Sequence, residues 1–417
     1  MRWFVLQGRR VRLALALLVV GGAGNAGRVL AADLRLDEAL ARAHAASPVL
    51  RAAEADLAAA QARLRQARLI PANPTLSGDV ARHALGPDVE NDRGIEVGQE
   101  VEIGQRGLRI RAAEHDVAHA MQALADRRRT VDGEVRRAFW GLAAAERRRA
   151  LAEERLALAR RVAEATRRRL RSGEVGTLDA RLAELEATRA ETERTAAETA
   201  RAEAVARLGV ALGAPADESL TVAPGEERPL VREPEAALVA RALAERPDLA
   251  AAREEAARLE AEAAVVRRRG WIPNPTFRGF YRHESGNERI LGGGISVPLP
   301  VFNREQGTEA ELLAQASGAK TEVARLRDAI PREVHVAVVR RDAADAAWRR
   351  YETEALPAAR EAQAALARAF DAGSLGLPEL LVQQDRLLQV RGAAIDAWLE
   401  RHEADAQVLE AVGGEAP

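Results

Sequence analysis

The chain has 417 residues, of which 30% are charged and only 3% are aromatic, and it contains no cysteine. A composition rich in Ala, Leu, Arg and Glu is typical of long helices packed side by side and argues against a thick globular core. The net charge of −1 argues against a nucleic-acid partner, because the arginine clusters 127–129 and 267–269 have acidic neighbours along the chain. Without cysteine, neither disulfides nor a lipid-modified N-terminal cysteine is expected.

The first 31 residues have the features of an export signal. Arg9, Arg10 and Arg12 precede a short apolar run, small residues follow, and Ala31 fits a cleavage site. We therefore predict a signal peptide over residues 1–31. This stretch holds five arginines and no acid, so the rest of the chain carries a net charge of −6. The apolar run is too short to cross a bilayer, and no other segment approaches 18 apolar residues, so no transmembrane helix is predicted.

The next segment, residues 32–231, is predicted to begin with a helix that ends where Pro71 and Pro74 remove backbone donors. A strand pair at 75–103 follows, because the apolar period changes there from 3.6 to 2. The absence of helix breakers then predicts a long helix over 107–172, which at about 1.5 Å per residue is roughly 100 Å long. A turn and a return helix of roughly 35 residues complete this first half.

The second half, residues 232–417, repeats this order. Its elements are a helix ending at Pro273 and Pro275, a strand pair at 276–301, a long helix over 307–372, and a return helix. Polar loops at 84–93 and 284–289 are predicted to close the two hairpins. Pro331 is expected to interrupt the second long helix, with a bend as the simplest explanation.

The predicted strands have one apolar and one polar or small face. Along 94–103, apolar residues at 95, 97, 101 and 103 alternate with glutamates and glycine, and positions 295, 297, 299 and 301 are apolar in the same way. This pattern is typical of transmembrane β-strands, with a half-buried soluble sheet as the alternative. Trp271, Phe277, Phe280 and Tyr281 fit an aromatic girdle at a membrane interface. Four strands cannot close a membrane barrel, so strands from several subunits must combine.

The order of elements, together with the segment VPLPVFNREQG at 297–307, resembles the outer-membrane efflux channels, the TolC-like outer-membrane factors, over residues 34–412. The resemblance implies a mainly α fold with a transmembrane β part. Long helical hairpins would form a periplasmic α-barrel, and four strands per protomer would complete a 12-stranded outer-membrane β-barrel in a trimer. The implied partners are two further copies of the chain, a periplasmic adaptor (membrane fusion) protein, an inner-membrane pump of the RND type, and outer-membrane lipid. The proline-rich segment is more similar to the heavy-metal cation branch.

Two turns, GEVGTLD at 173–179 and GSLGLPE at 373–379, carry one pattern 200 residues apart. We expect the glycines of each turn to supply positive φ, Thr177 to cap its return helix, and Pro378 to take the first helical position. A plain helical hairpin is the alternative, but the resemblance favours docking of the adaptor at these tips. The candidate docking residues are Gly173, Val175, Gly176, Thr177, Gly373, Leu375, Gly376 and Leu377.

Asp179 and Glu379 occupy the same place in the two turns and are the candidate pore-gate residues. An acid in the first helical turn is favoured by the helix dipole, by about 0.3–1 kcal/mol, whatever its function. In a trimer, however, these residues would also form a ring of six carboxylates that repel one another in a closed pore and favour cations. Both interpretations stay open at this point.

Residues able to carry out chemistry are scarce. His115 and His119 lie four residues apart and could share a metal ion, but without a third ligand we interpret them as a solvated helix face and predict no metal site. We find no phosphate-binding loop, nucleophile elbow or zinc-protease motif, so neither a cofactor nor an enzymatic activity is predicted.

The sequence thus predicts an exported outer-membrane channel of a tripartite efflux system, with a long periplasmic extension. Its substrates would be metal cations or, alternatively, drugs. Two other functions stay open: the channel of a type I protein secretion system, and a periplasmic coiled-coil adaptor or scaffold. The alternating strand pairs argue against the adaptor and scaffold.

Overall fold

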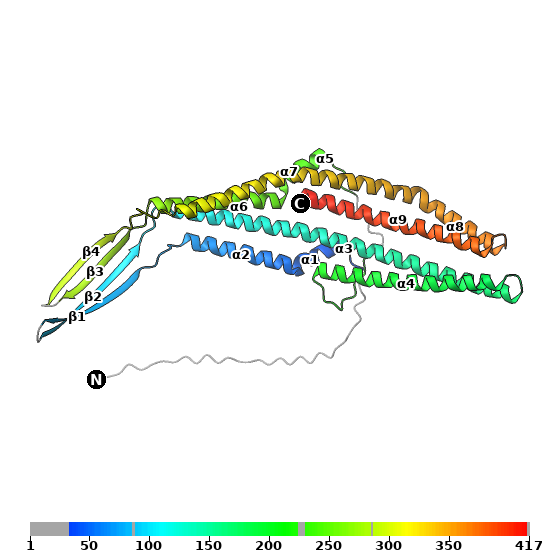
Figure 1. Cartoon of the computed structure of the whole chain (residues 1–417), viewed down its shortest axis with the longest axis horizontal. Helices are drawn as coiled ribbons and strands as arrows, with labels where there is room; N and C mark the ends of the chain where they lie inside the picture. The colour runs from blue at the N-terminus through cyan, green and yellow to red at the C-terminus, as the bar shows by residue number, and fades with distance from the viewer. Residues whose placement is uncertain (1–32, 86–87, 224–229, 285–286, 415–417) are drawn as a thin grey trace, which may run out of the picture. The chain divides into compact units, whose positions relative to one another are not determined.

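The computed structural model describes residues 33–85, 88–223, 230–284 and 287–414 (Figure 1). Asp33–Pro417 form one compact unit. The predicted signal peptide lies outside the described residues. Among the described helices, none combines the length and the apolar character needed to cross a membrane.

The longest helix, α3, spans Arg106–Arg171, so its 66 residues extend over about 100 Å. It begins and ends within one residue of the predicted bounds. α4, Thr177–Leu212, returns along α3. α9, Leu377–Val412, is the corresponding return helix of the second half and packs on α3, α7 and α8 (Figure 1). Both return helices have 36 residues, close to the predicted length.

The second long helix is divided into three parts: α7 (Gln306–Arg350), a five-residue π-helix η1 (Tyr351–Ala355), and α8 (Leu356–Asp371). The helix does not end at the predicted interruption, because α7 continues through Pro331. Ile330 and Val334 on either side are fully buried, and this packing holds the helix despite the lost hydrogen bond. The irregularity instead lies next to Pro357, where a wider i→i+5 turn accommodates the missing N–H.

Two shorter helix pairs flank the long helices. α1 (Leu36–Ala46) and α2 (Pro48–Arg68) precede the first strand pair, and α5 (Glu235–Glu245) and α6 (Pro247–Trp271) precede the second. A proline begins both α2 and α6, at the position where its missing N–H has no helical partner. α2 packs on α3, whereas α6 contacts both α3 and α7.

The sheet joins the two halves, because β2 pairs with β3 and the strand order is β1-β2-β3-β4, all antiparallel. The strands are β1 (Thr75–Leu85), β2 (Asp88–Glu100), β3 (Thr276–Glu284) and β4 (Glu288–Ser296). At the chain connections, the sheet is continuous with the ends of α2 and α6 and with the beginnings of α3 and α7 (Figure 1).

Two strand predictions need correction. The loop predicted over 84–93 is mostly strand, since pairing continues to Leu85 and Asp88, and in the second hairpin it continues to Glu284 and Glu288. Ladder hydrogen bonds are made by the backbone, so polar side chains did not end the strands. The strand expected to reach residue 301 ends at Ser296, because Pro298 and Pro300 have no N–H for a ladder.

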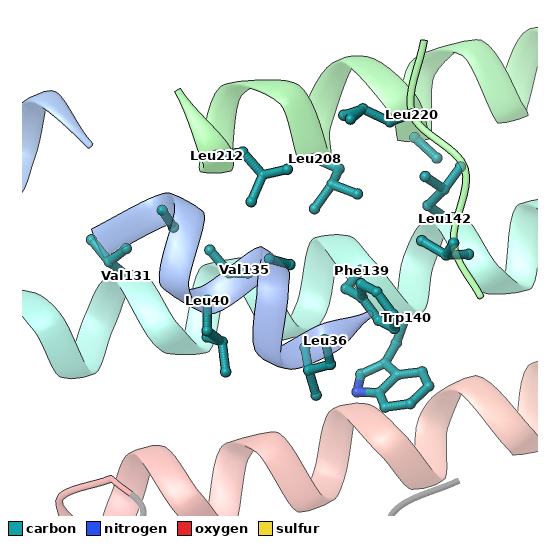
Figure 2. Packing of buried hydrophobic residues seen from close by; sticks show 14 of the residues in the cluster. Leu36, Leu40, Val131, Val135, Phe139, Trp140, Leu142, Leu208, Leu212 and Leu220 are labelled. Atoms are coloured by element: carbon teal, nitrogen blue, oxygen red, sulfur yellow. The ribbon is translucent and has the colours of Figure 1, made fainter. Parts of the chain in front are cut away.

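The largest core lies where α1, α3, α4 and α9 meet. Figure 2 shows Leu36 and Leu40 of α1 facing Val135 and Phe139 of α3, with Leu208 of α4 on the other side. Phe139 and Leu208 are fully buried. Five alanines are also buried in this cluster and allow the helices to approach closely, as the composition predicted: Ala39, Ala43, Ala144, Ala145 and Ala204.

Candidate functional site: the β-sheet and the hairpin tips

The two faces of the sheet differ in chemistry. Residues paired across an antiparallel ladder lie on the same face, so the register assigns each side chain to a face. Among the described residues, all exposed large apolar side chains of the sheet belong to one face, with exposed fractions of 44–84%. They are Leu76, Val80, Ile95, Val97, Phe277, Tyr281, Leu291 and Ile295. An uncovered face of this kind is what lipid, rather than water, solvates.

The opposite face is polar, and its charged side chains contact one another or cover neighbouring glycines. Glu96 and Arg278 lie 3.7 Å apart on it, and the Asp79 carboxylate covers Gly94, where a Cβ would come within 2.4 Å. Phe280 also lies on this face, across Gly292. The prediction that Phe280 belongs to an aromatic girdle is therefore wrong, because residue 280 has the opposite parity to 277 and 281.

The sheet has two open edges. β1 and β4 each have a single neighbour, so among the described strands their outer backbone groups have no ladder partner. In hydrocarbon each unpaired group costs several kcal/mol. A sheet with an apolar outer face and open edges can therefore be stable in a membrane only when another chain pairs with both edges.

At the far end of the long helices, both tips are built by the same turn. Gly173 has φ +76°, and Gly373 has φ +74°. The N–H of Gly173 donates to the Leu170 carbonyl, and that of Glu174 to the Arg169 carbonyl at 2.9 Å. The same two bonds recur 200 residues later. These bonds define a Schellman motif, in which a left-handed residue satisfies the last carbonyls of a helix.

The second glycine of each turn does not adopt positive φ, contrary to the prediction. Gly176 (φ −80°) and Gly376 (φ −71°) have extended backbones and are the N-cap residues of α4 and α9. Thr177 is therefore the first helical residue rather than the cap, and Pro378 is the second rather than the first. The extended conformation is accessible to any residue, so the backbone itself does not explain these two glycines.

The acidic gate candidates occupy the third position of their helices. The Gly176 N–H donates to the Asp179 carboxylate at 3.3 Å, so Asp179 supports the helix start as a capping-box residue. Glu379 is exposed at the same position of α9.

Not all the predicted docking residues are accessible. Leu377 is only 6% exposed and belongs to a cluster with Val162, Phe370 and Leu380 that joins the two hairpins. It therefore cannot offer a docking surface in this protomer. Val175 and Leu375 are half-buried, whereas the four glycines and Thr177 are exposed. Leu178, which was not among the candidates, is 69% exposed.

Ion pairs also connect the two hairpins near these tips. The guanidinium of Arg155 on α3 contacts Glu186 of α4 at 2.8 Å and Asp385 of α9 at 3.3 Å. Glu154 accepts two hydrogen bonds from Arg391 of α9, and these bonds lower the pKa of Glu154 below its usual value. The relative position of the two hairpins is thus partly set by charge.

The histidine pair on α3 has partners on α6. His115 Nδ1 lies 2.7 Å from the Glu254 carboxylate, and His119 Nδ1 lies 3.0 Å from the Ala251 carbonyl. They belong to a helix interface, so the prediction of a solvated face is wrong. In the part of the chain that the structure describes, no group of three or more metal-ligating side chains comes together.

One buried polar cluster was not predicted. His402 stacks on Trp140 with ring centroids 3.9 Å apart, and Trp398 contacts both rings edge-on. Burial, together with Arg401 and Arg147, lowers the pKa of His402 to about 3, so the ring is neutral at physiological pH. Trp398 and His402 lie four residues apart, on one face of α9, in a chain with few aromatic residues. That spacing was the available signal.

The geometry defines a class of protein: a protomer of an outer-membrane channel, with strands for the membrane and helical hairpins far longer than a bilayer is thick. The family model of the outer membrane efflux proteins matches residues 29–214. The first half of the chain is therefore similar to the outer membrane efflux proteins.

Relatives agree with this family. The cobalt-zinc-cadmium resistance protein CzcC of Cupriavidus metallidurans is 29% identical over 367 residues, which is 87% of this chain and 86% of the relative. The fold is shared with the outer-membrane channel OprN (TM-score 0.75, 18% identity, 91% of this chain and 90% of that chain). It is also shared with CmeC of Campylobacter jejuni (TM-score 0.75, 15% identity, 91% of this chain and 85% of that chain). CusC has the same fold as well (TM-score 0.73, 16% identity, 95% of this chain and 96% of that chain).

Proposed function

We propose that the chain is the outer-membrane channel component of a tripartite efflux system and gives metal cations a passive exit from the cell. The observation that carries this proposal is the sheet with one uncovered apolar face and two open edges, joined to helices of about 100 Å. No step of this function breaks or forms a covalent bond, so the protein acts as a duct and not as an enzyme.

The open edges support a homotrimer. Four strands from each of three copies give twelve, which exceeds the roughly eight strands needed to close a membrane barrel. Outer-membrane fractionation followed by gel electrophoresis with and without heating tests this assembly. We expect a heat-sensitive trimer in the outer-membrane fraction, and a soluble monomer would contradict the channel function.

The repeated halves, 32–231 and 232–417, would then arrange six hairpin tips around the periplasmic end of the trimer. We propose that these tips dock a periplasmic adaptor that connects the channel to an inner-membrane pump of the RND type. The exposed Gly176 and Gly376 support the proposal, because neither a strained backbone nor a neighbouring atom of this chain requires glycine there. A partner surface in close contact would require it.

Asp179 and Glu379 are proposed to line the narrow end of the pore as a ring of six carboxylates. Replacing them together, Asp179→Asn with Glu379→Gln, removes the ring charge, and conductance in planar bilayers should lose cation preference. Glu174→Gln, a neutralised acid on the same turn but outside the helix, is the matched control. An unchanged preference for cations in the double variant would contradict the carboxylate ring and leave Asp179 with only its role in capping α4.

The substrate class rests on the relative that confers cobalt, zinc and cadmium resistance. Deletion of the gene, followed by growth on these three metals and on a drug panel, tests it. Sensitivity to metals alone supports a metal channel, whereas sensitivity to drugs alone contradicts it.

A further inference from the structure

The apolar face of the sheet continues beyond the last ladder residue. After Ser296 the chain runs without strand pairing, yet Val297, Leu299 and Val301 keep the parity of Ile295 and are exposed by 46, 78 and 63%. Phe302 is 94% exposed. The four side chains extend the apolar surface toward the end of α6, where Trp271 is 67% exposed.

Gly270 fixes this segment against α6. A Cβ at Gly270 would come within 2.1 Å of the Arg304 carbonyl oxygen, so only glycine lets the backbone of Arg304 approach the helix there. That approach places the Arg304 guanidinium 5.0 Å from the centre of the Trp271 ring, where cation–π attraction stabilises it. Arg304 Nε also donates to the Pro300 carbonyl at 3.0 Å. The pair is therefore held in place by the fold.

The charge of Arg304 is not neutralised by its neighbours. The adjacent Glu305 pairs with Arg269, and Glu309 pairs with Arg267 at 2.5 Å. Among the described residues, Arg304 has no carboxylate within ion-pair distance. The segments that join helices to sheet, 65–70, 101–109, 267–273 and 297–309, contain eight arginines and three glutamates. Their net charge is +5, in a chain of net charge −1.

From this arrangement we propose that Arg304 and Trp271, with residues 297–302, form a docking site for an anionic phospholipid. The apolar side chains contact the acyl chains, the tryptophan ring lies at the interface, and the guanidinium binds the phosphate. The first half offers no equivalent, since Leu69 stands where Trp271 does and Gly104 where Arg304 does. A trimer would hence carry three such sites. The inference rests on the proposed function as an outer-membrane channel, and it names the class of lipid that binds at this surface of the protein.

Fluorescence quenching in bilayer nanodiscs tests the site. Of the tryptophans after the predicted signal peptide, Trp271 is exposed, Trp140 and Trp398 are buried, and Trp348 is half-buried against the helix core. The assembled channel is placed in phosphatidylcholine containing an equal mole fraction of brominated phosphatidylglycerol or brominated phosphatidylcholine. The Trp271→Phe variant provides the background signal. We expect the brominated anionic lipid to be enriched about fivefold at Trp271, and Arg304→Gln to abolish this preference. Arg171→Gln, which removes an exposed arginine at the distant end of α3, should preserve it.

Equal quenching by both lipids in the unaltered protein would overturn the inference and leave the channel function intact. Absence of quenching by either lipid in a correctly inserted trimer would also overturn it, since a second copy of the chain would then cover the segment. A chain that does not enter the bilayer at all would contradict the channel function itself, and with it this site.

Discussion

The two glycines of each tip should behave differently when a methyl group is added, although both are exposed and lie three residues apart. Alanine at position 173 must adopt φ +76°, which costs about 1–2 kcal/mol. Part of this cost is offset because alanine restricts the unfolded chain, by about 0.4–1 kcal/mol. The net loss is about 1 kcal/mol, confined to the turn. The Glu174 amide, which donates to Arg169, should therefore exchange about fivefold faster with solvent.

Alanine at position 176 should leave the turn intact. Its backbone is already extended, and a Cβ would lie 3.9 Å from its nearest neighbour, the Asp179 carboxylate. The weaker capping by alanine and its smaller unfolded-state entropy offset each other to within about 0.5 kcal/mol. If the tip docks a partner, however, Gly176→Ala should reduce metal resistance in a complemented deletion strain.

Hydrogen exchange of the purified trimer and growth on metal salts, measured on both variants, separate the two effects. The reasoning about the turn fails if Gly173→Ala leaves exchange at Glu174 unchanged, or if Gly176→Ala accelerates it equally. The docking proposal fails if Gly176→Ala and the bulkier Gly176→Leu both retain full resistance while the protein reaches normal levels.

Two further outcomes follow from buried side chains. Leu377→Ala should destabilise the cluster between the hairpins by about 2–5 kcal/mol and lower the thermal midpoint of the trimer. Leu178→Ala, at a residue that is 69% exposed, should leave the midpoint unchanged. Equal midpoints of the two variants would contradict the burial of Leu377. The folded-state pKa of His402 is below its ordinary value of 6.5, so its contribution to stability is complete above pH 6.5 and is lost as pH falls toward about 3. His402→Gln should make the free energy of unfolding less dependent on pH between pH 6.5 and about 3, by up to about 1.4 kcal/mol per pH unit. An unchanged pH dependence would show that the imidazole ring of His402 is not held in its neutral form in the folded protein.

Much of the fold could be predicted because its signals are local and repeated. The absence of proline over 66 residues predicted α3 to within one residue at each end. The period-two pattern at 95 and 97 predicted which face of β2 is apolar, and the ladder register confirms it. Sequence reasoning failed where packing decides. Pro331 looks like a helix breaker, but the burial of Ile330 and Val334 keeps the helix intact.

The candidate site was predictable only in outline. The tip pattern located both turns, because a helix that ends at a left-handed residue needs glycine there. Whether a turn residue points inward depends on the other hairpin, which lies 200 residues away in the sequence. For that reason the sequence alone predicts Leu377 as a docking residue, although the second hairpin buries it. The contact of Trp140 with His402 is of the same kind, since α3 and α9 meet only in the folded chain.

The most direct test of the central claim is the accessibility of the two sheet faces in the native outer membrane. The chain has no cysteine, so single cysteines can be introduced without background and labelled with a membrane-impermeant maleimide. We predict that cysteines at 95, 97, 291 and 295 are protected by lipid, whereas those at 96, 278 and 296 react from the water-filled lumen. Labelling that does not alternate with a period of two, or that is strong on the apolar face, would contradict a membrane channel.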